Sequence, residues 1–296
     1  MIDRACISLN NACNLRCKYC HFQDKMDNDE SMSYENLKTI IDNIHSYCTI
    51  NNFTNFKLGI VGSGEPMIKK KLIINMLEYI SSHNYNELNV YSITNGTLLT
   101  EEDLIVFYRY KEIIKLCFSL DGYESLHNVG RAAFSKTFNT VKLYNKIFGC
   151  MPSINATVNK ISYQNKEKVI EFFKDLKIES VVFSKLVGYT ENDLYLTDEE
   201  FIDFLNFAKS MGYSSRQFNS IKKYDCTMYG NLCGVGRTNI FFTNEGVYPC
   251  GRFYKNKKYL LGKATDSLVF FENEMMKITP VEDGLCYYQK NVEVNK

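Results

Sequence analysis

The chain has 296 residues, of which 45% are hydrophobic, and its formal net charge is +1. This length predicts about two domains with a full apolar core, and the near-neutral charge argues against a nucleic-acid-binding surface. No apolar run approaches the roughly 20 residues of a membrane span, and no signal-peptide pattern opens the chain, so we expect a cytoplasmic protein. Eleven cysteines in that compartment indicate metal sites or thiol chemistry rather than disulfides.

Residues 1–212 alternate between short apolar strands and longer helical patterns. The predicted strands are residues 5–9, 56–61, 88–93, 114–120, 153–158 and 179–185. Ser33, Thr100 and Thr197 each stand where a helix N-cap is expected. Six βα units predict an α/β fold in which a parallel sheet carries helices on its outside. Ligands of such sheets bind beyond the carboxyl ends of the strands.

The loop after the first predicted strand contains Cys13, Cys17 and Cys20 in a C-x3-C-x2-C pattern. One tight loop with this spacing can direct three sulfurs at a single point. Three thiolates leave one corner of a four-iron cluster without a protein ligand, so that iron is open to a substrate or cofactor. The alternative is a structural zinc loop.

The pattern changes after about residue 213, where cysteines and glycines become frequent. The four cysteines of this part are Cys226, Cys233, Cys250 and Cys286. Residues 240–250 read as a strand, a turn and a second strand. We therefore predict a small metal-stapled module over residues 213–296, too short for a large core of its own.

The cysteine loop and the segments that follow it resemble the radical S-adenosylmethionine (SAM) superfamily, and Tyr19, just before the third cysteine, matches its usual pattern. The resemblance implies a partial (β/α)6 TIM-like barrel with a [4Fe–4S] cluster whose open iron binds SAM. Reductive cleavage of SAM would then yield a radical that abstracts hydrogen from a substrate. Such an enzyme needs a low-potential electron donor, for which flavodoxin or ferredoxin is expected.

The ends of the second and third strands resemble SAM-binding turns of this family. Gly62-Ser63-Gly64-Glu65-Pro66 is similar to a Gly-Gly-Glu-Pro stretch that hydrogen-bonds the amino group of SAM, where Gly64 would allow close backbone approach. The resemblance implies that Glu65 accepts from the ammonium, whereas Ser63 replaces the first glycine. It also places Asn95 near SAM or the substrate. Ordinary turns between strand and helix are the alternative reading of both stretches.

Strand alternation places Cys117, Ser119 and Asp121 on one face of the fourth strand. The resemblance implies that Ser119 and Asp121 lie near SAM or the substrate, and that Asn155 on the fifth strand is a weaker candidate for contact with the nucleoside. Because its face should look into the barrel, Cys117 could donate a hydrogen atom to a substrate radical.

His127 and Arg131 match the His-x3-Arg that follows Asp-Gly in the family. Arg131 is thereby expected to pair with the methionyl carboxylate, for which a guanidinium fork is well suited. An exposed ion pair at a helix start is the alternative for Arg131.

The C-terminal cysteines resemble the start of a SPASM or twitch domain. The resemblance implies one auxiliary [4Fe–4S] cluster held by Cys226, Cys233, Cys250 and Cys286. If Cys286 does not coordinate, that cluster keeps an open site for a substrate thiolate. A zinc site is the alternative.

The combination of domains is most similar to the peptide maturases of this superfamily. It implies a ribosomally synthesised precursor peptide as substrate and a thioether or carbon–carbon crosslink as product. The alternatives are peptide epimerisation with a cysteine hydrogen donor, dehydrogenation of a small molecule, and a cluster-stabilised binding protein without activity. Because the first strand lies close to Met1, a leader peptide is expected to bind the barrel, the C-terminal module or a separate protein.

Overall fold

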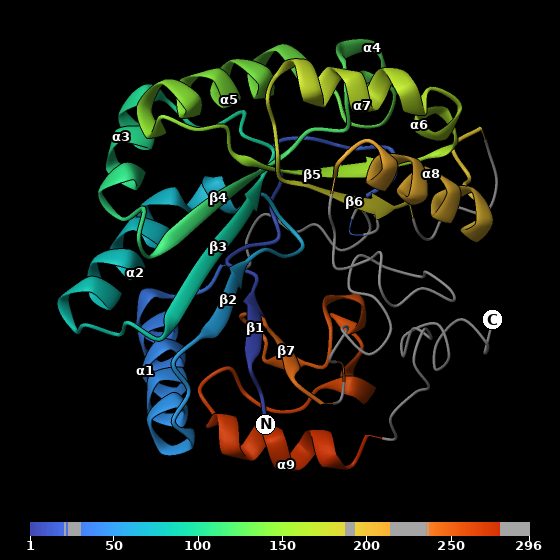
Figure 1. Cartoon of the computed structure of the whole chain (residues 1–296). Helices are drawn as coiled ribbons and strands as arrows, with labels where there is room; N and C mark the ends of the chain where they lie inside the picture. The colour runs from blue at the N-terminus through green and yellow to red at the C-terminus, as the bar shows by residue number, and fades with distance from the viewer. Residues whose placement is uncertain (21, 23–30, 187–192, 214–234, 236, 279–296) are drawn as a thin grey trace.

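The computed structural model describes the chain except residues 21, 23–30, 187–192, 214–234, 236 and 279–296. One curved eight-stranded sheet, in the order β6-β5-β4-β3-β2-β1-β7-β8, forms the centre of the described part. The helices follow the outer side of this curve (Figure 1). The predicted α/β fold with a parallel sheet inside a layer of helices is therefore confirmed.

The first six strands run parallel, each paired with its neighbour in sequence. The strands are β1 (Arg4–Ile7), β2 (Phe56–Ile60), β3 (Leu88–Thr94), β4 (Ile114–Ser119), β5 (Ser153–Val158), β6 (Val181–Lys185), β7 (Asn239–Phe242) and β8 (Val247–Tyr248). Each of the six runs predicted from the sequence overlaps one of these strands. In β3 the side chains alternate between buried and more exposed positions, as expected when successive residues face opposite sides of a sheet.

The α-helices are α1 (Tyr34–Asn51), α2 (Lys70–Ser82), α3 (Glu101–Arg109), α4 (Glu124–Gly130), α5 (Phe134–Phe148), α6 (Lys160–Gln164), α7 (Lys166–Asp175), α8 (Asp198–Ser210) and α9 (Leu268–Met276). Short 3-10 helices are η2 (Pro66–Lys69), η5 (Gly251–Phe253) and η6 (Lys257–Tyr259). The expected N-caps are confirmed, because Ser33, Thr100 and Thr197 each accept a backbone N–H of the first helical turn. Such caps satisfy donors that the helix itself leaves without partners.

The main hydrophobic core fills the space between the sheet and its outer helices. Ile44 of α1, Phe107 of α3 and Phe204 of α8 are completely buried in it, as are Leu58 and Phe183 from the sheet. Burial of one such side chain contributes about 1.5–3 kcal/mol relative to leaving it in water. The packed outer layer leaves the carboxyl ends of the strands free to carry loops.

The expected C-terminal hairpin is present, since β7 and β8 pair antiparallel through residues 243–246. Its first strand also pairs parallel with β1, from Arg4 opposite Asn239 to Ile7 opposite Phe242. No pattern in the sequence predicted this pairing. It makes the hairpin an extension of the barrel sheet on the β1 side.

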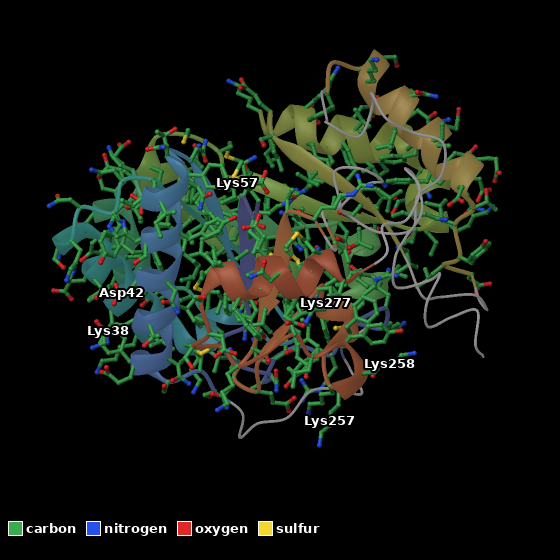
Figure 2. All side chains as sticks on the ribbon, turned by 90° about the horizontal axis from the view of Figure 1, so that it is seen from below. Lys38, Asp42, Lys57, Lys257, Lys258 and Lys277 are labelled. Atoms are coloured by element: carbon green, nitrogen blue, oxygen red, sulfur yellow. The ribbon has the colours of Figure 1, made fainter. Side chains whose placement is uncertain are left out.

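Surface lysines are spread over separate elements, as Figure 2 shows for Lys38, Lys57, Lys258 and Lys277. Lys38 lies 2.8 Å from a carboxylate oxygen one helical turn away, and Lys277 lies 2.6 Å from another. Pairs of this kind are typical of solvated helix faces. None of the helices in the described part of the chain is both long and apolar enough to cross a membrane.

Candidate active site

The cysteine loop leaves β1 and is fixed by the loops after β2 and α4. The backbone N–H of Glu65 donates to the carbonyl of Ala12 (2.8 Å), and that of Lys18 donates to the carbonyl of Gly130 (2.8 Å). A Cβ on Gly64 would lie 2.3 Å from the Ala12 carbonyl oxygen. Glycine is therefore required at position 64 for close approach to the protein's own loop.

A triangle of polar side chains ties the cysteine loop to the turn after β3. Asn95 Nδ2 donates to Asn14 Oδ1 (3.0 Å), Asn14 Nδ2 donates to Thr97 Oγ1 (2.7 Å), and the Thr97 N–H donates to Asn95 Oδ1 (2.9 Å). Asn95, expected near SAM, does border the cavity described below. Its amide is nonetheless engaged by the protein, so it also holds the loop in place.

The three thiols of the loop, Cys13, Cys17 and Cys20, border one cavity of about 250 Å³ at the carboxyl ends of the strands. Within the described ranges, no three His, Cys, Asp or Glu side chains gather closely enough for one metal ion. A four-iron cluster is bound through different irons, so its ligand sulfurs stand further apart than those around a single ion. Three thiols that border one cavity are a donor set that fits such a cluster.

Cys13 illustrates the electrostatics of the loop. Burial raises the pKa of the Cys13 thiol, the Leu15 N–H that it accepts acts in the opposite direction, and the nearby Glu65, Cys17 and Cys20 raise it further. Neighbouring thiolates repel one another, and bound iron removes this repulsion. The loop thus brings together acidic groups that a cationic cluster would stabilise.

Glu65 stands between the ends of β2 and β3 and is 4% exposed. Oε1 accepts from the Met67 N–H (3.0 Å) and the Thr94 hydroxyl (2.5 Å), and Oε2 accepts from the Asn95 N–H (2.9 Å). Burial raises the pKa of Glu65, although these three hydrogen bonds act in the opposite direction. A carboxylate has about four acceptor sites, so one remains for a ligand, and Glu65 borders the cavity.

Ser63 stands where the family pattern has glycine, and it is hydrogen-bonded to two polar neighbours. Its hydroxyl donates to Asn11 Oδ1 and lies 3.2 Å from the Ser8 hydroxyl, and its N–H donates to Ser8 Oγ (3.2 Å). The extra side chain is therefore paired inside the protein, at the edge of the cavity.

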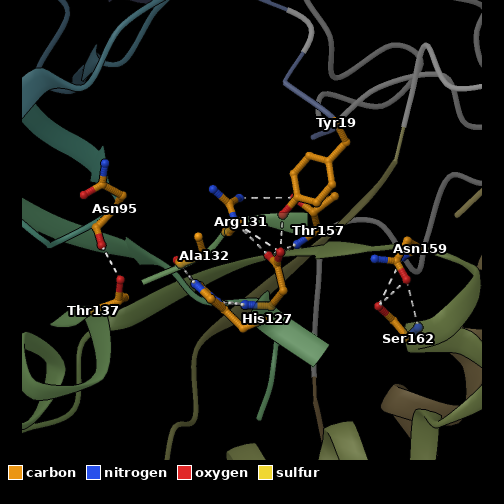
Figure 3. Close-up of polar contacts among 10 residues, drawn as sticks. Tyr19, Asn95, His127, Arg131, Ala132, Thr137, Thr157, Asn159 and Ser162 are labelled. Carbon is orange, nitrogen blue, oxygen red and sulfur yellow. Dashed lines mark hydrogen bonds and ion pairs between the residues drawn. The ribbon is translucent and has the colours of Figure 1, made fainter. Parts of the chain in front are cut away.

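Asp121, after β4, is buried and joins three residues, Tyr19, Arg131 and Thr157, whose arrangement Figure 3 shows. Both of its oxygens accept from Arg131 Nε (3.1 Å), Oδ1 accepts from the Thr157 N–H (2.8 Å), and Oδ2 accepts from the Tyr19 hydroxyl. The described residues that border the cavity include Tyr19, Thr157 and Arg131 but not Asp121. Asp121 thus orients the lining side chains from behind.

Arg131 is held from several directions at once. The Tyr19 ring centroid lies 5.5 Å from its guanidinium carbon, one terminal nitrogen donates to Thr157 Oγ1 (3.3 Å), and the guanidinium also hydrogen-bonds Cys17. Burial by itself lowers the pKa of Arg131, but Asp121, Tyr19 and Cys17 outweigh it and raise the pKa above its usual value. The sequence-based alternative of an exposed ion pair is wrong, because Asp121 is only 2% exposed.

The remaining expected residues differ in how far along their strands they lie, and therefore in whether they border the cavity. Ser119 borders the cavity, whereas Cys117, two residues earlier on β4, is absent from the described lining. On β5 it is Thr157 that borders the cavity, and Asn155, two residues earlier, is absent from that lining. Cys117 and Asn155 are on the expected strands but lie deeper in the barrel.

Cys250 is half-buried at the end of the hairpin, where its sulfur accepts the Arg252 N–H (3.4 Å). Cys226, Cys233 and Cys286 lie outside the described residues. A Cβ on Gly251 would come within 3.3 Å of the Phe22 ring. The Cys250 turn therefore stands beside the end of the cysteine loop.

Sequence reasoning missed several residues that shape the site. Asn14 holds the cysteine loop, Ser8 pairs with Ser63, and Thr157 borders the cavity. Asparagines, serines and threonines at such places have no diagnostic spacing. The signal that could have found Thr157 is its position near the carboxyl end of β5, on the same face as Asn155.

The model of the Radical SAM superfamily matches residues 7–208. A cysteine-type anaerobic sulfatase-maturating enzyme from Clostridium perfringens (strain 13 / Type A) is 25% identical over 87% of this chain and 76% of its own length.

Among solved structures, native anSMEcpe with bound AdoMet has a TM-score of 0.76 at 20% identity, covering 93% of this chain and 80% of that one. Streptococcus suis SuiB bound to precursor peptide SuiA has a TM-score of 0.71 at 17% identity, covering 92% and 64%. At these identities the two structures support the fold alone. The family match covers more than half of the sequence and includes the cysteine loop and the strand ends around the cavity. The chain therefore belongs to the radical SAM superfamily, whose members are enzymes that use SAM and a [4Fe–4S] cluster.

Proposed function

We propose that Cys13, Cys17 and Cys20 bind the [4Fe–4S] cluster and that SAM occupies the cavity beside them. The observation that carries this proposal is the shared cavity, which the three thiols border together with Glu65 and Arg131. It offers sulfur donors, an anionic acceptor and a cationic donor within one space, as a zwitterionic amino-acid ligand beside a cluster requires.

The two ends of the methionyl group are matched by opposite sides of the cavity. Glu65 has one acceptor site beyond its three protein donors, and an ammonium is a suitable partner for it. Arg131 has five N–H donors, of which Asp121, Thr157 and Cys17 engage only some. We assign the remaining donors to the SAM carboxylate.

When bound, the cluster and SAM together supply a radical that removes hydrogen from a substrate. The protein's own part is to position the ligands and to exclude water. Tyr19, Leu186 and Leu194 form a buried apolar cluster against which Cys17 packs. These apolar side chains shield the Cys17 side of the loop from solvent. Exclusion of water protects reactive species from side reactions.

We infer that the substrate is a peptide, most simply a ribosomally synthesised precursor. The relative with a sulfatase-maturating name and the SuiB structure with its precursor peptide support this substrate class. A thioether or carbon–carbon crosslink is the product that we propose. Epimerisation would instead need a cysteine hydrogen donor, for which we propose Cys117, below the level of Ser119.

We further propose that residues 213–296 form a second unit with one auxiliary [4Fe–4S] cluster on Cys226, Cys233, Cys250 and Cys286. The support within the described residues is the half-buried Cys250, whose sulfur accepts a backbone N–H as cluster ligands do. The adjacent hairpin continues the barrel sheet through β7. This attachment would hold the second cluster at a fixed place beside the barrel.

The partners that we propose are a flavodoxin or ferredoxin as electron donor and, for leader-peptide recognition, a separate binding protein. A cytoplasmic location fits these partners, because reducing surroundings keep thiols available for iron.

The proposal is tested with anaerobically reconstituted protein, dithionite, SAM and candidate precursor peptides. We expect 5′-deoxyadenosine together with a peptide lighter by about 2 Da, the loss of two hydrogens on crosslinking or oxidation. A peptide whose mass is unchanged in H2O, but which gains deuterium in D2O, would indicate epimerisation rather than crosslinking. A requirement for a peptide cysteine would identify a thioether. No SAM cleavage by protein with a filled cluster would contradict the proposed function.

A further inference from the structure

The turn that carries Arg131 contains two strained residues. Ala132 has φ of +92° and Ala133 has φ of +60°, and neither is glycine. L-residues with a Cβ rarely adopt positive φ, and such strain persists only where the surroundings fix the backbone. Ala132 is itself solvent-exposed, so packing of its own side chain does not explain its conformation.

The start of the same turn is pressed against the cysteine loop. A Cβ on Gly130 would lie 2.0 Å from the Tyr19 ring, and the Gly130 carbonyl accepts the Lys18 N–H (2.8 Å). Arg131 follows directly and donates to Asp121. A shift of this turn would therefore move the Arg131 guanidinium relative to both Asp121 and the cysteine loop.

His127 connects the end of β4, at Asp121, to the strained turn, at Ala132. Its Nδ1 accepts the backbone N–H of Asp121 (3.3 Å), and its Nε2 lies 3.2 Å from the carbonyl oxygen of Ala132 (Figure 3). An acceptor is needed at Nδ1 and a donor at Nε2, so the ring is the neutral tautomer with its proton on Nε2.

The surroundings of His127 favour this neutral form. The ring is 1% exposed and packs edge-on against Phe134, with centroids 5.7 Å apart. Burial lowers the pKa of His127, and Asp121 only partly opposes this.

We propose that His127 is a positioning residue that holds the strained Arg131–Ala133 turn, and with it the Arg131 guanidinium, in the geometry that binds the SAM carboxylate. The inference rests on the proposed SAM site. The contact with Ala132 is the one that fixes the turn, because it joins α4 to the residue of highest strain. The contact with Asp121 sets the ring orientation that makes this possible.

Two conservative variants separate these contacts. In Asn, Oδ1 stands as many bonds from Cβ as Nδ1 does in His, so H127N keeps an acceptor for Asp121 and loses the donor to Ala132. In Gln, Nε2 matches the histidine Nε2, so H127Q keeps the donor to Ala132. Dissociation constants of SAM are measured by equilibrium dialysis on anaerobically reconstituted full-length protein without reductant, so that no turnover occurs.

We expect H127N to weaken SAM binding about tenfold and H127Q to weaken it less than threefold. Adding A132G to H127N should bring the dissociation constant back to within about threefold of wild type, because glycine adopts φ of +92° without strain. H45Q is the matched control, since His45 pairs with Glu87 (2.7 Å) on elements outside the cavity, and it should bind SAM like wild type.

A purely structural role for His127 predicts a different pattern. H127N would then melt at a lower temperature than wild type, but its folded form would bind SAM unchanged and A132G would restore nothing; that result would overturn the inference. Equal losses in H127N and H127Q would also overturn it, because they would remove the assigned importance of the Ala132 contact. Absence of SAM binding by wild-type protein with a filled cluster would instead refute the proposed function.

Discussion

The two buried carboxylates of the site, Glu65 and Asp121, differ in what surrounds them. Glu65 accepts only neutral donors, two backbone N–H groups and one hydroxyl, from the ends of β2 and β3. Asp121 accepts from the cationic Arg131 as well as from Tyr19 and Thr157. Glu65 also borders the cavity, whereas Asp121 is absent from its described lining.

This difference explains how one cavity can recognise both ends of a zwitterion. The β2–β3 side presents a charged acceptor whose position is fixed by the backbone. The β4–α4 side presents a charged donor, Arg131, whose position is fixed by a carboxylate behind it. Each side therefore keeps the charge that its ligand group requires, and each can be broken separately.

The largest effect is expected from replacing one cysteine of the loop that lies between these two sides of the cavity. Cys17→Ala deletes a proposed iron ligand that also contacts Arg131, so SAM cleavage should fall by on the order of a thousandfold or more. Iron content and 5′-deoxyadenosine are measured after reconstitution. Cys150→Ala, at an exposed cysteine, is the control and should behave like wild type. Full activity of the Cys17 variant would refute the assigned cluster site.

Asp121→Asn removes the negative charge behind Arg131 while keeping the side-chain shape. The buried guanidinium then lacks its ionic partner, so the free energy of unfolding should fall by about 3 kcal/mol. Urea denaturation with and without SAM measures the change. An unfolding free energy equal to that of wild type would show that Arg131 does not depend on Asp121.

Glu65→Gln breaks the other side. Its three contacts all need acceptors, but the amide nitrogen is a donor and would face one of them. We expect a loss of about 2 kcal/mol in unfolding free energy and a SAM affinity at least tenfold weaker. If affinity stays at the wild-type value while stability falls, Glu65 serves only to join β2 and β3.

The β4–α4 side should also respond to pH. Burial lowers the pKa of His127 below its ordinary value of 6.5, so the unfolded chain takes up this proton first as the pH falls. The stability contributed by the neutral ring is present above about pH 6.5 and is lost as the pH falls toward the folded-state value. Wild type should therefore lose more stability than H127Q between pH 7 and pH 5, by about the amount due to one titrating group. Parallel pH profiles of wild type and H127Q would show that His127 does not titrate with a lowered pKa in the folded protein.

Ser63→Gly restores the glycine of the family pattern and should have the smallest effect. It removes the hydroxyl contacts to Ser8 and Asn11, which are worth about 1 kcal/mol of unfolding free energy. SAM affinity should change less than threefold. A larger change in affinity would indicate that Ser63 itself contacts the ligand.

Sequence patterns predicted the strands and the faces of the site but not its depth. Alternation placed Ser119 and Cys117 on one face of β4, yet of these two only Ser119 is among the described residues that border the cavity. Asn155, expected from the family resemblance, likewise lies two residues before Thr157, the residue of β5 that borders the cavity. Alternation repeats every two residues, so it identifies a face and carries no information about height along the barrel.

Contacts between distant segments were also beyond sequence reasoning. The pairing of β7 with β1 joins residues more than 230 positions apart, and the bond from Asn95 to Asn14 joins two loops. Neither leaves a periodic signal. By contrast, the caps at Thr100 and Thr197 are local patterns of four residues, and both were predicted correctly.

The central claim is most directly tested by measuring 5′-deoxyadenosine from anaerobically reconstituted protein given dithionite and SAM. We expect the nucleoside from wild type and Cys150→Ala but not from Cys17→Ala. Its absence from wild-type protein with a filled cluster, or equal amounts from all three proteins, would contradict the account.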